Sequence, residues 1–465
     1  MTTISVPFHG EGAGVGELTW GQKHIWRAMR DSGSSLSMSA TRTLAEGARL
    51  DEFVDELRFF MSRFQPMRTR LCFPVDDGRL ASFAGGDGGT MQEVYASGEA
   101  QLEIIDIDAG TDAAKAAEVL SQRHVDTPFD YPNEWPLRMA LVRQDGVLTH
   151  LVTTLCHIAA DATGAFAMFT DLLRRDPVTG DPGGPVAGLQ PLELARMQRE
   201  PAARRQSEAA LRHWEDVLRT MPPKRFADPI DRGEPRYRQV GYASPAMHLG
   251  LRLLGERLRL DAAPMLLAAF AVALARVTGG NPVVAQLIGS NRFRPGFAEI
   301  VSPVNQAGLC SLDVADMTIA EAMQLTKRRS ITAYKYAYYD PDDLDVLLAR
   351  VRRERGDLDR SVVYNDRRPP GPPPEPGGPV PTEAEIRAAS NMGVLRWERL
   401  DQFKGKLMLN VNNEPDTVDL MAQADTRYLS TEDMEALLRG MESVVVEAAS
   451  DPSASTGIGP GPVTP

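Results

Sequence analysis

The sequence predicts a mixed α/β protein, and three observations support this fold class. Segments with the alternation or the β-rich character of strands recur along the chain, helical periodicities lie between them, and the composition is globular, with 43% hydrophobic and 25% charged residues. The length of 465 residues predicts two to four domains, or one large unit built from two similar parts. Collagen-like, wholly disordered and disulfide-scaffold proteins are excluded.

Each predicted element follows from a local pattern. Strands are predicted at 35–44, across LRMALVRQ and LTHLVTTLCH within 137–157, and at 282–289, 361–365 and 406–413. Helices are predicted at 50–64, 165–175, 207–221, 265–275 and 431–450. The run MLLAAFAVALA at 265–275 is shorter than the roughly 20 residues that span a bilayer, so it predicts a buried helix.

Two breaker-rich stretches divide the chain. The stretch DPVTGDPGGPVAG at 176–188 predicts the end of a first half, so we expect an N-terminal half over 1–180, a C-terminal half over 181–450 and a flexible tail over 451–465. The stretch 367–381 holds eight prolines in fifteen residues, which a helix or a sheet does not accommodate. It predicts an exposed loop, more readily a tolerated insertion than a segment recognised by aromatic grooves.

Charge and cysteine content limit the function classes. The 51 basic and 63 acidic residues give a net charge of −12, which disfavours binding to nucleic acid or to a membrane through a polybasic surface of the protein. Cys72, Cys156 and Cys310 form no CxxC pair, so neither a disulfide framework nor a metal site is predicted. The N-terminus lacks the basic and apolar regions of a signal peptide, and we expect a cytoplasmic location.

The segment CHIAADATG at 156–164 carries the strongest candidate chemistry. A strand that ends in His157 presents an imidazole beside a loop, and Asp161 follows four positions later, near the start of a helix. An imidazole suits a general base near neutral pH, while the aspartate could orient the ring or bind a distant arginine. The same short pattern also fits a core histidine followed by a helix N-cap aspartate.

The order of the surrounding segments favours the catalytic interpretation. They are LTWGQ with Ile25 and Trp26, PMRTR at 66–70, PFD at 128–130, PLR at 136–138, HWEDVLRTMP, the long segment that ends in SPVN, VYN at 363–365 and the strand at 406–411. In this order they resemble the condensation domain of nonribosomal peptide synthetases, in the chloramphenicol-acetyltransferase-like superfamily, over about residues 17–450. The resemblance implies two chloramphenicol-acetyltransferase-like halves in a V-shaped pseudo-dimer, with mixed sheets flanked by helices.

The resemblance also assigns roles to residues. The family's His-His-x-x-x-Asp-Gly motif falls on 156–162, so His157 becomes the catalytic residue midway along a tunnel. Asp161 is expected to pair with Arg68 and to hold the loop. Further candidates for the substrate tunnel are Cys156, Ala162, Gly164, Asn291, Arg292 and Asn305. Without coordinates, Arg68 and Arg292 fit exposed surface charges equally well.

This sequence departs from the family's pattern at Cys156, where the family has its first His, and at Ala162, where it has Gly. A buried thiol can replace a structural histidine as a small hydrophobe. A nucleophilic Cys156 is disfavoured, because successive residues of a strand point to opposite faces, and Cys156 and His157 would then not face one substrate. The SPVN segment at 302–305 is shorter than the family's Gly-Phe-x-Val-Asn, which leaves the shape of that loop open.

The implied activity is that of a free-standing, monomeric acyltransferase of natural-product biosynthesis. It would join a thioester-activated acyl group, on the phosphopantetheine arm of an acyl or peptidyl carrier protein or on CoA, to a small-molecule amine or alcohol, with no permanently bound cofactor. We find no adenylation motif and no Gly-rich phosphate loop. The segment DSGSSLS at 31–37 resembles a carrier attachment site only superficially, because a predicted strand follows it.

An acidic carrier would need a basic docking surface on this acidic chain, for which 231–238 and KRRS at 327–330 are candidates. Two alternative functions remain. The first is a non-catalytic domain that recruits partner proteins, as in relatives of this fold that lost the His motif. The second is an O-acyltransferase that uses soluble acyl-CoA.

Overall fold

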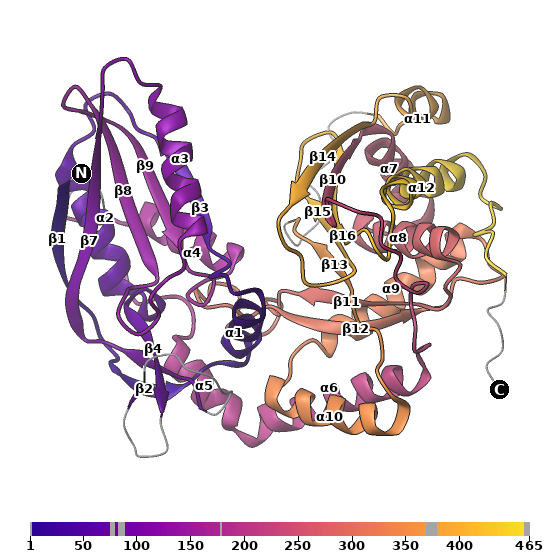
Figure 1. Cartoon of the computed structure of the whole chain (residues 1–465), viewed down its shortest axis with the longest axis horizontal. Coiled ribbons are helices and arrows are strands. Elements are labelled where there is room, and N and C mark those ends of the chain that lie inside the picture. The colour runs from indigo at the N-terminus through magenta and orange to yellow at the C-terminus, as the bar shows by residue number, and fades with distance from the viewer. Residues whose placement is uncertain (1, 75–79, 82–88, 177–178, 369–378, 460–465) are drawn as a thin grey trace. The chain divides into compact units, whose positions relative to one another are not determined.

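A computed structural model describes residues 2–74, 80–81, 89–176, 179–368 and 379–459 (Figure 1). The chain forms two compact units: unit 1 contains Met1–Arg204 and Ser290–Asn305, and unit 2 contains Arg205–Gly289 and Gln306–Pro465. The first boundary therefore lies after the predicted one at residue 180. The segment 290–305 returns to unit 1, which the order of the sequence does not reveal.

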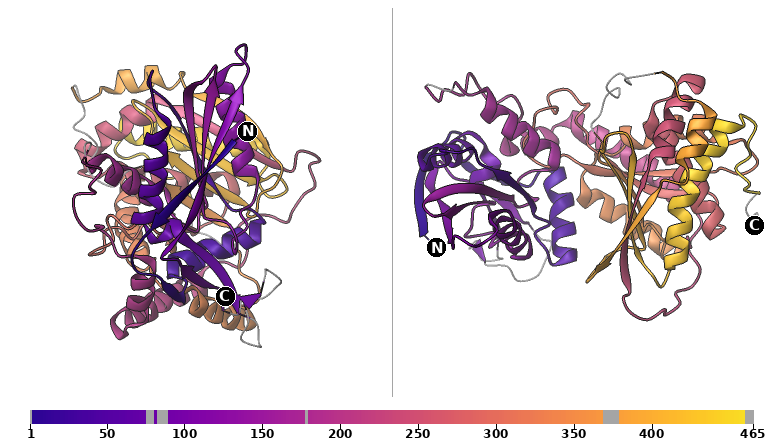
Figure 2. Two further views of the ribbon diagram at one scale, coloured as in Figure 1. Left: turned by 90° about the vertical axis from the view of Figure 1, so that its left-hand side faces the viewer. Right: turned by 90° about the horizontal axis from the view of Figure 1, so that it is seen from above.

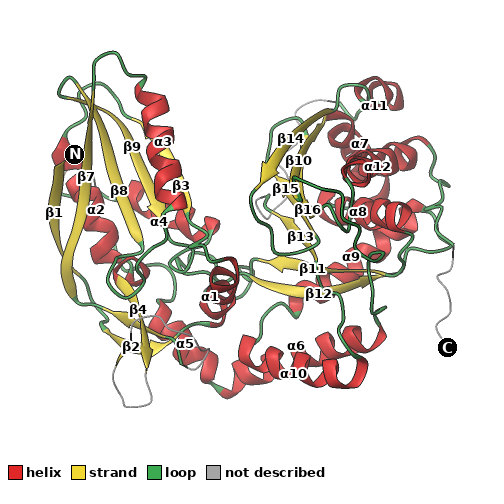
Figure 3. Cartoon of the chain, viewed as in Figure 1, coloured by secondary structure: helices red, strands yellow, loops and turns green. Residues whose placement is uncertain are grey.

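Unit 1 is built on a five-stranded sheet with the order β1-β7-β8-β9-β3. Strands β7 and β8 are parallel and the other pairs are antiparallel. Met139 and Leu141 of β8 belong to the apolar cluster with α2 and α4, whereas Ala140 and Val142 pack with α3, so helices cover both faces of the sheet (Figure 3). A second sheet has the order β2-β6-β4-β5.

The strands of unit 1 are β1 (Thr2–His9), β2 (Gly14–Glu17), β3 (Met38–Thr43), β4 (Thr69–Pro74), β5 (Leu80–Ala81), β6 (Met91–Val94), β7 (Ser97–Ile107), β8 (Leu137–Gln144) and β9 (Val147–Leu155). Its helices are α1 (Trp20–Ser32), α2 (Leu50–Arg63), the 3-10 helix Gln65–Arg68, α3 (Ala113–Asp126), α4 (Ala162–Arg174) and α5 (Pro191–Arg199). Helix α6 (Pro201–Thr220) begins in unit 1 and continues into unit 2.

Unit 2 is built on a seven-stranded mixed sheet with the order β12-β11-β13-β15-β16-β10-β14. One face packs against α7, α8, α9 and α12, which share the largest apolar cluster, and Figure 2 shows α12 running along this sheet. Its strands are β10 (Tyr237–Ser244), β11 (Val283–Gly289), β12 (Gln306–Leu312), β13 (Val362–Asp366), β14 (Val394–Leu400), β15 (Leu407–Asn412) and β16 (Val418–Asp425). Its helices after α6 are α7 (Pro245–Leu258), α8 (Ala262–Thr278), α9 (Ile319–Lys335), α10 (Pro341–Arg355), α11 (Glu383–Ala389) and α12 (Thr431–Ser450).

The predicted mixed α/β class is confirmed, and the apolar run 265–275 lies inside α8 with every residue buried. Among the described residues, no single helix is long and apolar enough to cross a membrane. Helices α7 and α8 meet the criteria of length and composition only as a pair, which is bent by 112°.

The prediction of a flexible tail is wrong for residues 451–459, because they pack against unit 2. Thr456 is fully buried, and its hydroxyl donates to the carbonyl of Val314 at 2.8 Å. Ser455 forms an isolated β-bridge with Thr318. Residues 460–465, and 369–378 within the predicted proline-rich loop, lie outside the described residues.

Candidate active site

The candidate base lies in the turn between β9 and α4. Strand β9 ends at Leu155, and the next two amides donate to residues that precede β8 and β3 in the chain. The amide of Cys156 donates to the carbonyl of Pro136 at 2.9 Å, on the β8 side. The amide of His157 donates to the carbonyl of Ser35 at 3.3 Å, on the β3 side. The turn is therefore held by the segments that lead into both neighbouring strands.

The imidazole of His157 is fixed by a hydrogen bond within this turn. Its Nδ1 lies 2.9 Å from the carbonyl oxygen of Ala160. Because a carbonyl oxygen can only accept, Nδ1 carries the proton, and in the neutral ring Nε2 keeps its lone pair. The half-buried ring thus has the tautomer that accepts a proton at Nε2.

Cys156 is fully buried in an apolar cluster that includes Leu18, Trp26 and Ile158. Burial raises the pKa of its thiol to about 12, so the thiolate that a nucleophile requires is not populated near neutral pH. The expectation that a strand runs through Cys156 and His157 is wrong, since the strand ends at Leu155, before both residues. The environment of Cys156, rather than strand alternation, separates it chemically from His157.

Asp161 pairs with Arg292 rather than with Arg68, so the predicted pairing is wrong. Its carboxylate caps α4 by accepting the amide of Gly164 at 2.7 Å, accepts the amide of Val304 at 3.2 Å and forms a buried ion pair with Arg292. The pairing with Arg68 was what the resemblance to the family implied. The later segment of unit 1 brings Arg292 to the turn instead.

Arg68 is 1% exposed, so the alternative of an exposed surface charge is wrong for it. Its guanidinium donates to the carbonyl of Tyr95 at 2.7 Å and to the carbonyl of Glu11. Burial lowers its pKa. A Cβ atom on Gly10 would lie 2.4 Å from Nε of Arg68, so the close approach of this backbone requires glycine. Arg68 holds the chain before α1 rather than the His157 turn.

The remaining candidates lie in the segment 290–305 or at the start of α4. Asn291 donates from Nδ2 to the carbonyl of Val304 at 2.9 Å, and Arg292 donates from Nη1 to the carbonyl of Ile300 at 2.8 Å. These bonds hold the segment together, and Arg292 is 7% exposed, which excludes an exposed charge. Asn305 is half-buried, Gly164 is buried and Ala162 is exposed. The tunnel that these residues are predicted to line stays a prediction.

Sequence reasoning missed His24 of α1. The pKa of His24 is lowered to about 4 by burial, and by the positive charges of Arg27 and of His157 when protonated. A second imidazole therefore interacts electrostatically with the candidate base and stays neutral at physiological pH. The sequence gives no signal for this pairing, because the two residues are far apart in the chain and no motif connects them.

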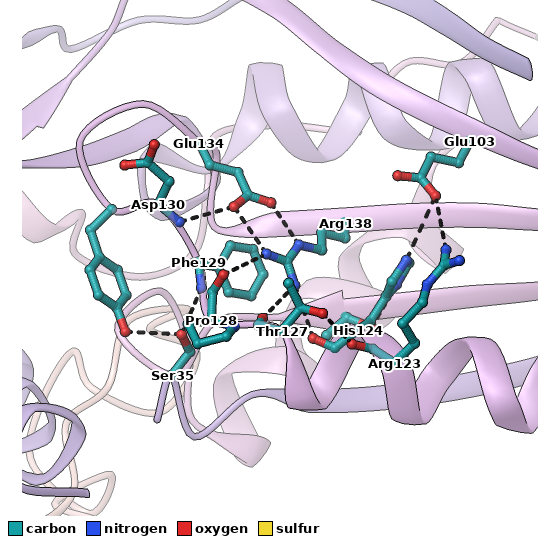
Figure 4. Close-up of polar contacts among 12 residues, drawn as sticks. Ser35, Glu103, Arg123, His124, Thr127, Pro128, Phe129, Asp130, Glu134 and Arg138 are labelled. Atoms are coloured by element: carbon teal, nitrogen blue, oxygen red, sulfur yellow. Dashed lines mark hydrogen bonds and ion pairs between the residues drawn. The ribbon is translucent and has the colours of Figure 1, made fainter. Parts of the chain in front are cut away.

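The segment that precedes β8 wraps Arg138 (Figure 4). The guanidinium of Arg138 binds the carboxylate of Glu134 through two bonds of 2.6 and 3.0 Å and lies 3.9 Å from the ring centroid of Phe129. It also donates to three backbone carbonyls, those of His124, Thr127 and Pro128. The predicted PFD and PLR segments thus fold around one arginine, and the carbonyl of Pro136 in the second segment receives the amide of Cys156.

The family model of the condensation domain matches residues 17–457. The chain belongs to the condensation-domain family. SgcC5 from Streptomyces globisporus is 18% identical over 95% of this chain and 100% of its own, with a TM-score of 0.66. The condensation domain of the Monacolin K polyketide synthase MokA is 17% identical over 96% and 100%, and the X-domain from teicoplanin biosynthesis 16% over 96% and 97%, each with a TM-score of 0.70. A comparison with curated protein sequences finds no match.

Membership of the condensation-domain family confirms the resemblance and the fold class predicted from the sequence. At such low identity the solved structures establish the fold alone. The chemistry of this condensation domain therefore has to be argued from its own turn, where His157 and Asp161 are present and Cys156 and Ala162 differ from the motif.

Proposed function

We propose that this condensation domain is an acyltransferase that joins a thioester-activated acyl group to an amine or a hydroxyl acceptor. The observation that supports this function best is the bond of 2.9 Å between Nδ1 of His157 and the carbonyl of Ala160. It leaves Nε2 to act on the acceptor. The complex of SgcC5 with a 1,2-ethanediol derivative supports a hydroxyl acceptor as one of the two possibilities.

The proposed reaction uses His157 as a proton acceptor. The N–H or O–H of the acceptor donates to Nε2, and its lone pair attacks the thioester carbonyl. The new C–N or C–O bond forms, the C–S bond breaks, and the proton held on Nε2 passes to the leaving thiolate. A hydroxyl needs this base more than an amine does, because an amine can react in its neutral form while His157 orients it.

In this proposal the acyl group is carried as a thioester on the phosphopantetheine arm of a carrier protein or on CoA itself, with no permanently bound cofactor. Of the two candidate docking surfaces, 231–238 is the weaker. Its Arg236 forms an ion pair with Asp425, and its Arg232 donates to the carbonyl of Thr426. These side chains already hold unit 2 together.

The second candidate surface, KRRS on α9, favours an acidic carrier. Helix α9 carries four basic residues and one acidic residue in a chain of net charge −12. Arg328 and Arg329 are exposed, and no ion pair joins them to another described residue. The neighbouring Ile331 is 60% exposed and offers apolar contact area. Cationic residues around an apolar contact suit an acidic carrier protein.

A covalent route through Cys156 is disfavoured, because burial raises the pKa of this thiol to about 12. Recruitment of a partner protein is the second candidate function, and one observation favours it. The X-domain from teicoplanin biosynthesis, whose fold is similar to this chain, has been solved in complex with OxyB. The changes at Cys156 and Ala162 are compatible with a domain that has kept the fold for binding.

A turnover assay with acyl donors on a panel of carrier proteins and on CoA tests the proposal. We expect His157→Ala to reduce turnover about 10²- to 10⁴-fold, the usual contribution of a general base. His9→Gln, which changes an exposed histidine of β1, is the matched control and should keep activity. Equal turnover by wild type and His157→Ala would exclude the base role. Absence of turnover with every donor would favour recruitment.

The docking surface is tested with the double charge reversal Arg328→Glu and Arg329→Glu. We expect KM for carrier-bound donors to rise about tenfold or more while KM for CoA-bound donors stays the same. Arg353→Glu, at an exposed arginine of α10, is the matched control. Unchanged turnover of the double variant on carrier-bound donor would rule out this surface.

A further inference from the structure

The loop between α1 and β3 is a rigid turn built by serines. Gly33 has a φ of 66° and Leu36 a φ of 46°, both in the left-handed region. The hydroxyl of Ser32 accepts the amide of Ser34 at 3.3 Å, and the hydroxyl of Ser34 accepts the amide of Leu36 at 3.2 Å. These local bonds fix the residue between them, Ser35, which is 1% exposed.

Ser35 connects this loop to two other segments of unit 1. Its carbonyl accepts the amide of His157 at 3.3 Å, and the thiol of Cys156 approaches the same oxygen at 3.9 Å. Its hydroxyl accepts the amide of Phe129 at 2.9 Å (Figure 4). The hydroxyl of Tyr131 lies 2.9 Å from the same oxygen. One buried serine therefore uses its backbone for the His157 turn and its side chain for the segment before β8.

The partners of the Ser35 hydroxyl are themselves anchored. The carbonyl of Tyr131 accepts the amide of Leu71 at 3.0 Å, which ties it to β4. The ring of Phe129 lies against the guanidinium of Arg138. Burial raises the pKa of Tyr131, so its phenol stays protonated and can donate to Ser35. A hydroxyl held between two anchored groups has little freedom, and neither has the carbonyl of the same residue.

We propose that Ser35 is a positioning residue for His157: its hydroxyl is locked by Phe129 and Tyr131, and its carbonyl then fixes the backbone of the base. The inference rests on the proposed role of His157 as the base. Among the described residues, the backbone of His157 has this one support on the β3 side, since Met38 pairs with Leu155 and the regular ladder ends there. Loss of the Ser35 hydroxyl should therefore loosen the turn at His157 more than the strands behind it.

The first experiment needs no substrate. In Ser35→Ala, hydrogen exchange of the His157 amide, followed by NMR, should become about tenfold faster, and the ¹⁵N shifts of the His157 ring should show a weaker preference for the Nδ1–H tautomer. Ser37→Ala is the matched control, because its hydroxyl lies in the same loop and has no hydrogen-bond partner among the described residues, and it should leave both readouts unchanged. Unchanged exchange and ring shifts in Ser35→Ala would overturn the inference.

Tyr131→Phe tests the same contact without touching Ser35, and it keeps the inference falsifiable if Ser35→Ala does not fold. We expect it to make hydrogen exchange of the His157 amide about threefold faster, a smaller increase than in Ser35→Ala. The double variant should be no worse than Ser35→Ala alone, because Ser35→Ala already removes the bond that Tyr131→Phe breaks. Independent, additive effects would refute the coupling.

Activity provides a second readout. With any donor that the wild type uses, Ser35→Ala should lower kcat about five- to tenfold and leave KM within twofold, since a displaced base affects the transition state rather than substrate binding. A rise in KM with kcat unchanged would contradict the positioning role. If the wild type turns over no donor, the proposed reaction fails, while the exchange and ring-shift measurements still decide whether Ser35 holds His157.

Discussion

The two units share one strand arrangement but use the turn after it differently. In unit 1 the neighbours β7-β8-β9-β3 are paired parallel, antiparallel and antiparallel, and in unit 2 β13-β15-β16-β10 are paired in the same way. In both units the third strand of this order leads into a helix, α4 or α12. The fold therefore presents the same strand-to-helix turn twice, and only one of the two carries a histidine.

The caps of the two helices show what distinguishes these turns. Ser430 caps α12 in a local capping box with Asp433. Asp161 also caps α4, but it is 1% exposed and additionally binds Val304 and Arg292 from a segment more than 120 residues away. A local cap is enough to start a helix. The long-range bonds at Asp161 instead fix the turn that holds the base, so the difference lies in tertiary contacts rather than in topology.

The largest expected effect is the loss of stability when each helix cap is replaced by alanine. Asp161→Ala leaves the buried guanidinium of Arg292 without its carboxylate, which should lower the free energy of unfolding by about 3 to 5 kcal/mol. Ser430→Ala removes two local hydrogen bonds, both with Asp433, and should cost about 1 kcal/mol. Denaturant unfolding of both variants measures the two values. Equal losses would show that the turn in unit 1 is held no more tightly than its counterpart.

A second prediction concerns His24, the imidazole that interacts electrostatically with His157 in unit 1. The pKa of His24 in the folded protein is about 4, below the value of about 6.5 expected in the unfolded chain. Between these values the unfolded state binds a proton that the folded state does not, so stability is complete above pH 6.5 and decreases as the pH falls towards 4. The side chain is half-buried, so solvent screening should limit the loss to about 1 to 2 kcal/mol.

His24→Gln checks this prediction. The free energy of unfolding of the variant and of the wild type is measured by denaturant titration from pH 7.5 to pH 4. At pH 7.5 the difference between the two free energies of unfolding reports packing alone. As the pH falls, the wild type should lose more stability than the variant. A difference that stays constant over this range would mean that His24 is protonated alike in the folded and unfolded chains.

Much of the fold could be predicted from the sequence, because strand and helix patterns are local. The buried α8 and the strands around the motif follow directly from periodicity. The packing of residues 451–459 could not be predicted, since small and polar residues such as Ser455 and Thr456 carry no apolar signal and are held by hydrogen bonds to β12–α9.

Only the site residues that belong to the sequence motif were predicted. His157 and Asp161 were found from their spacing and from the order of the neighbouring segments, and the helix cap that Asp161 forms was one of the interpretations considered. The partner of Asp161 was assigned wrongly, because Arg68 and Arg292 look alike in sequence and only the return of residues 290–305 to unit 1 separates them. Ser35 and His24 have no motif, since one acts through backbone bonds and the other through an electrostatic contact.

The smallest expected effect is the difference in stability between two glycine-to-alanine variants, one at Gly164 of α4 and one at Gly440 of α12. A Cβ atom on Gly164 would lie 3.0 Å from the carbonyl oxygen of Val301, which belongs to the backbone, and 3.2 Å from Nη2 of Arg292, which forms the ion pair with Asp161. A Cβ atom on Gly440 would lie 3.3 Å from the methyl group of Ala273, and the next atom lies 4.0 Å away, so this contact is milder.

We therefore expect Gly164→Ala to lower the free energy of unfolding by about 1 to 2 kcal/mol, because the tight contact outweighs the gain in helix propensity. Gly440→Ala should fall within about 0.5 kcal/mol of the wild type, since its milder contact roughly balances that gain. Denaturant unfolding of the two variants compares them under the same conditions. If Gly164→Ala were the more stable variant, residues 290–305 would have to be loosely held against α4, and the ion pair of Asp161 would then not distinguish the two turns.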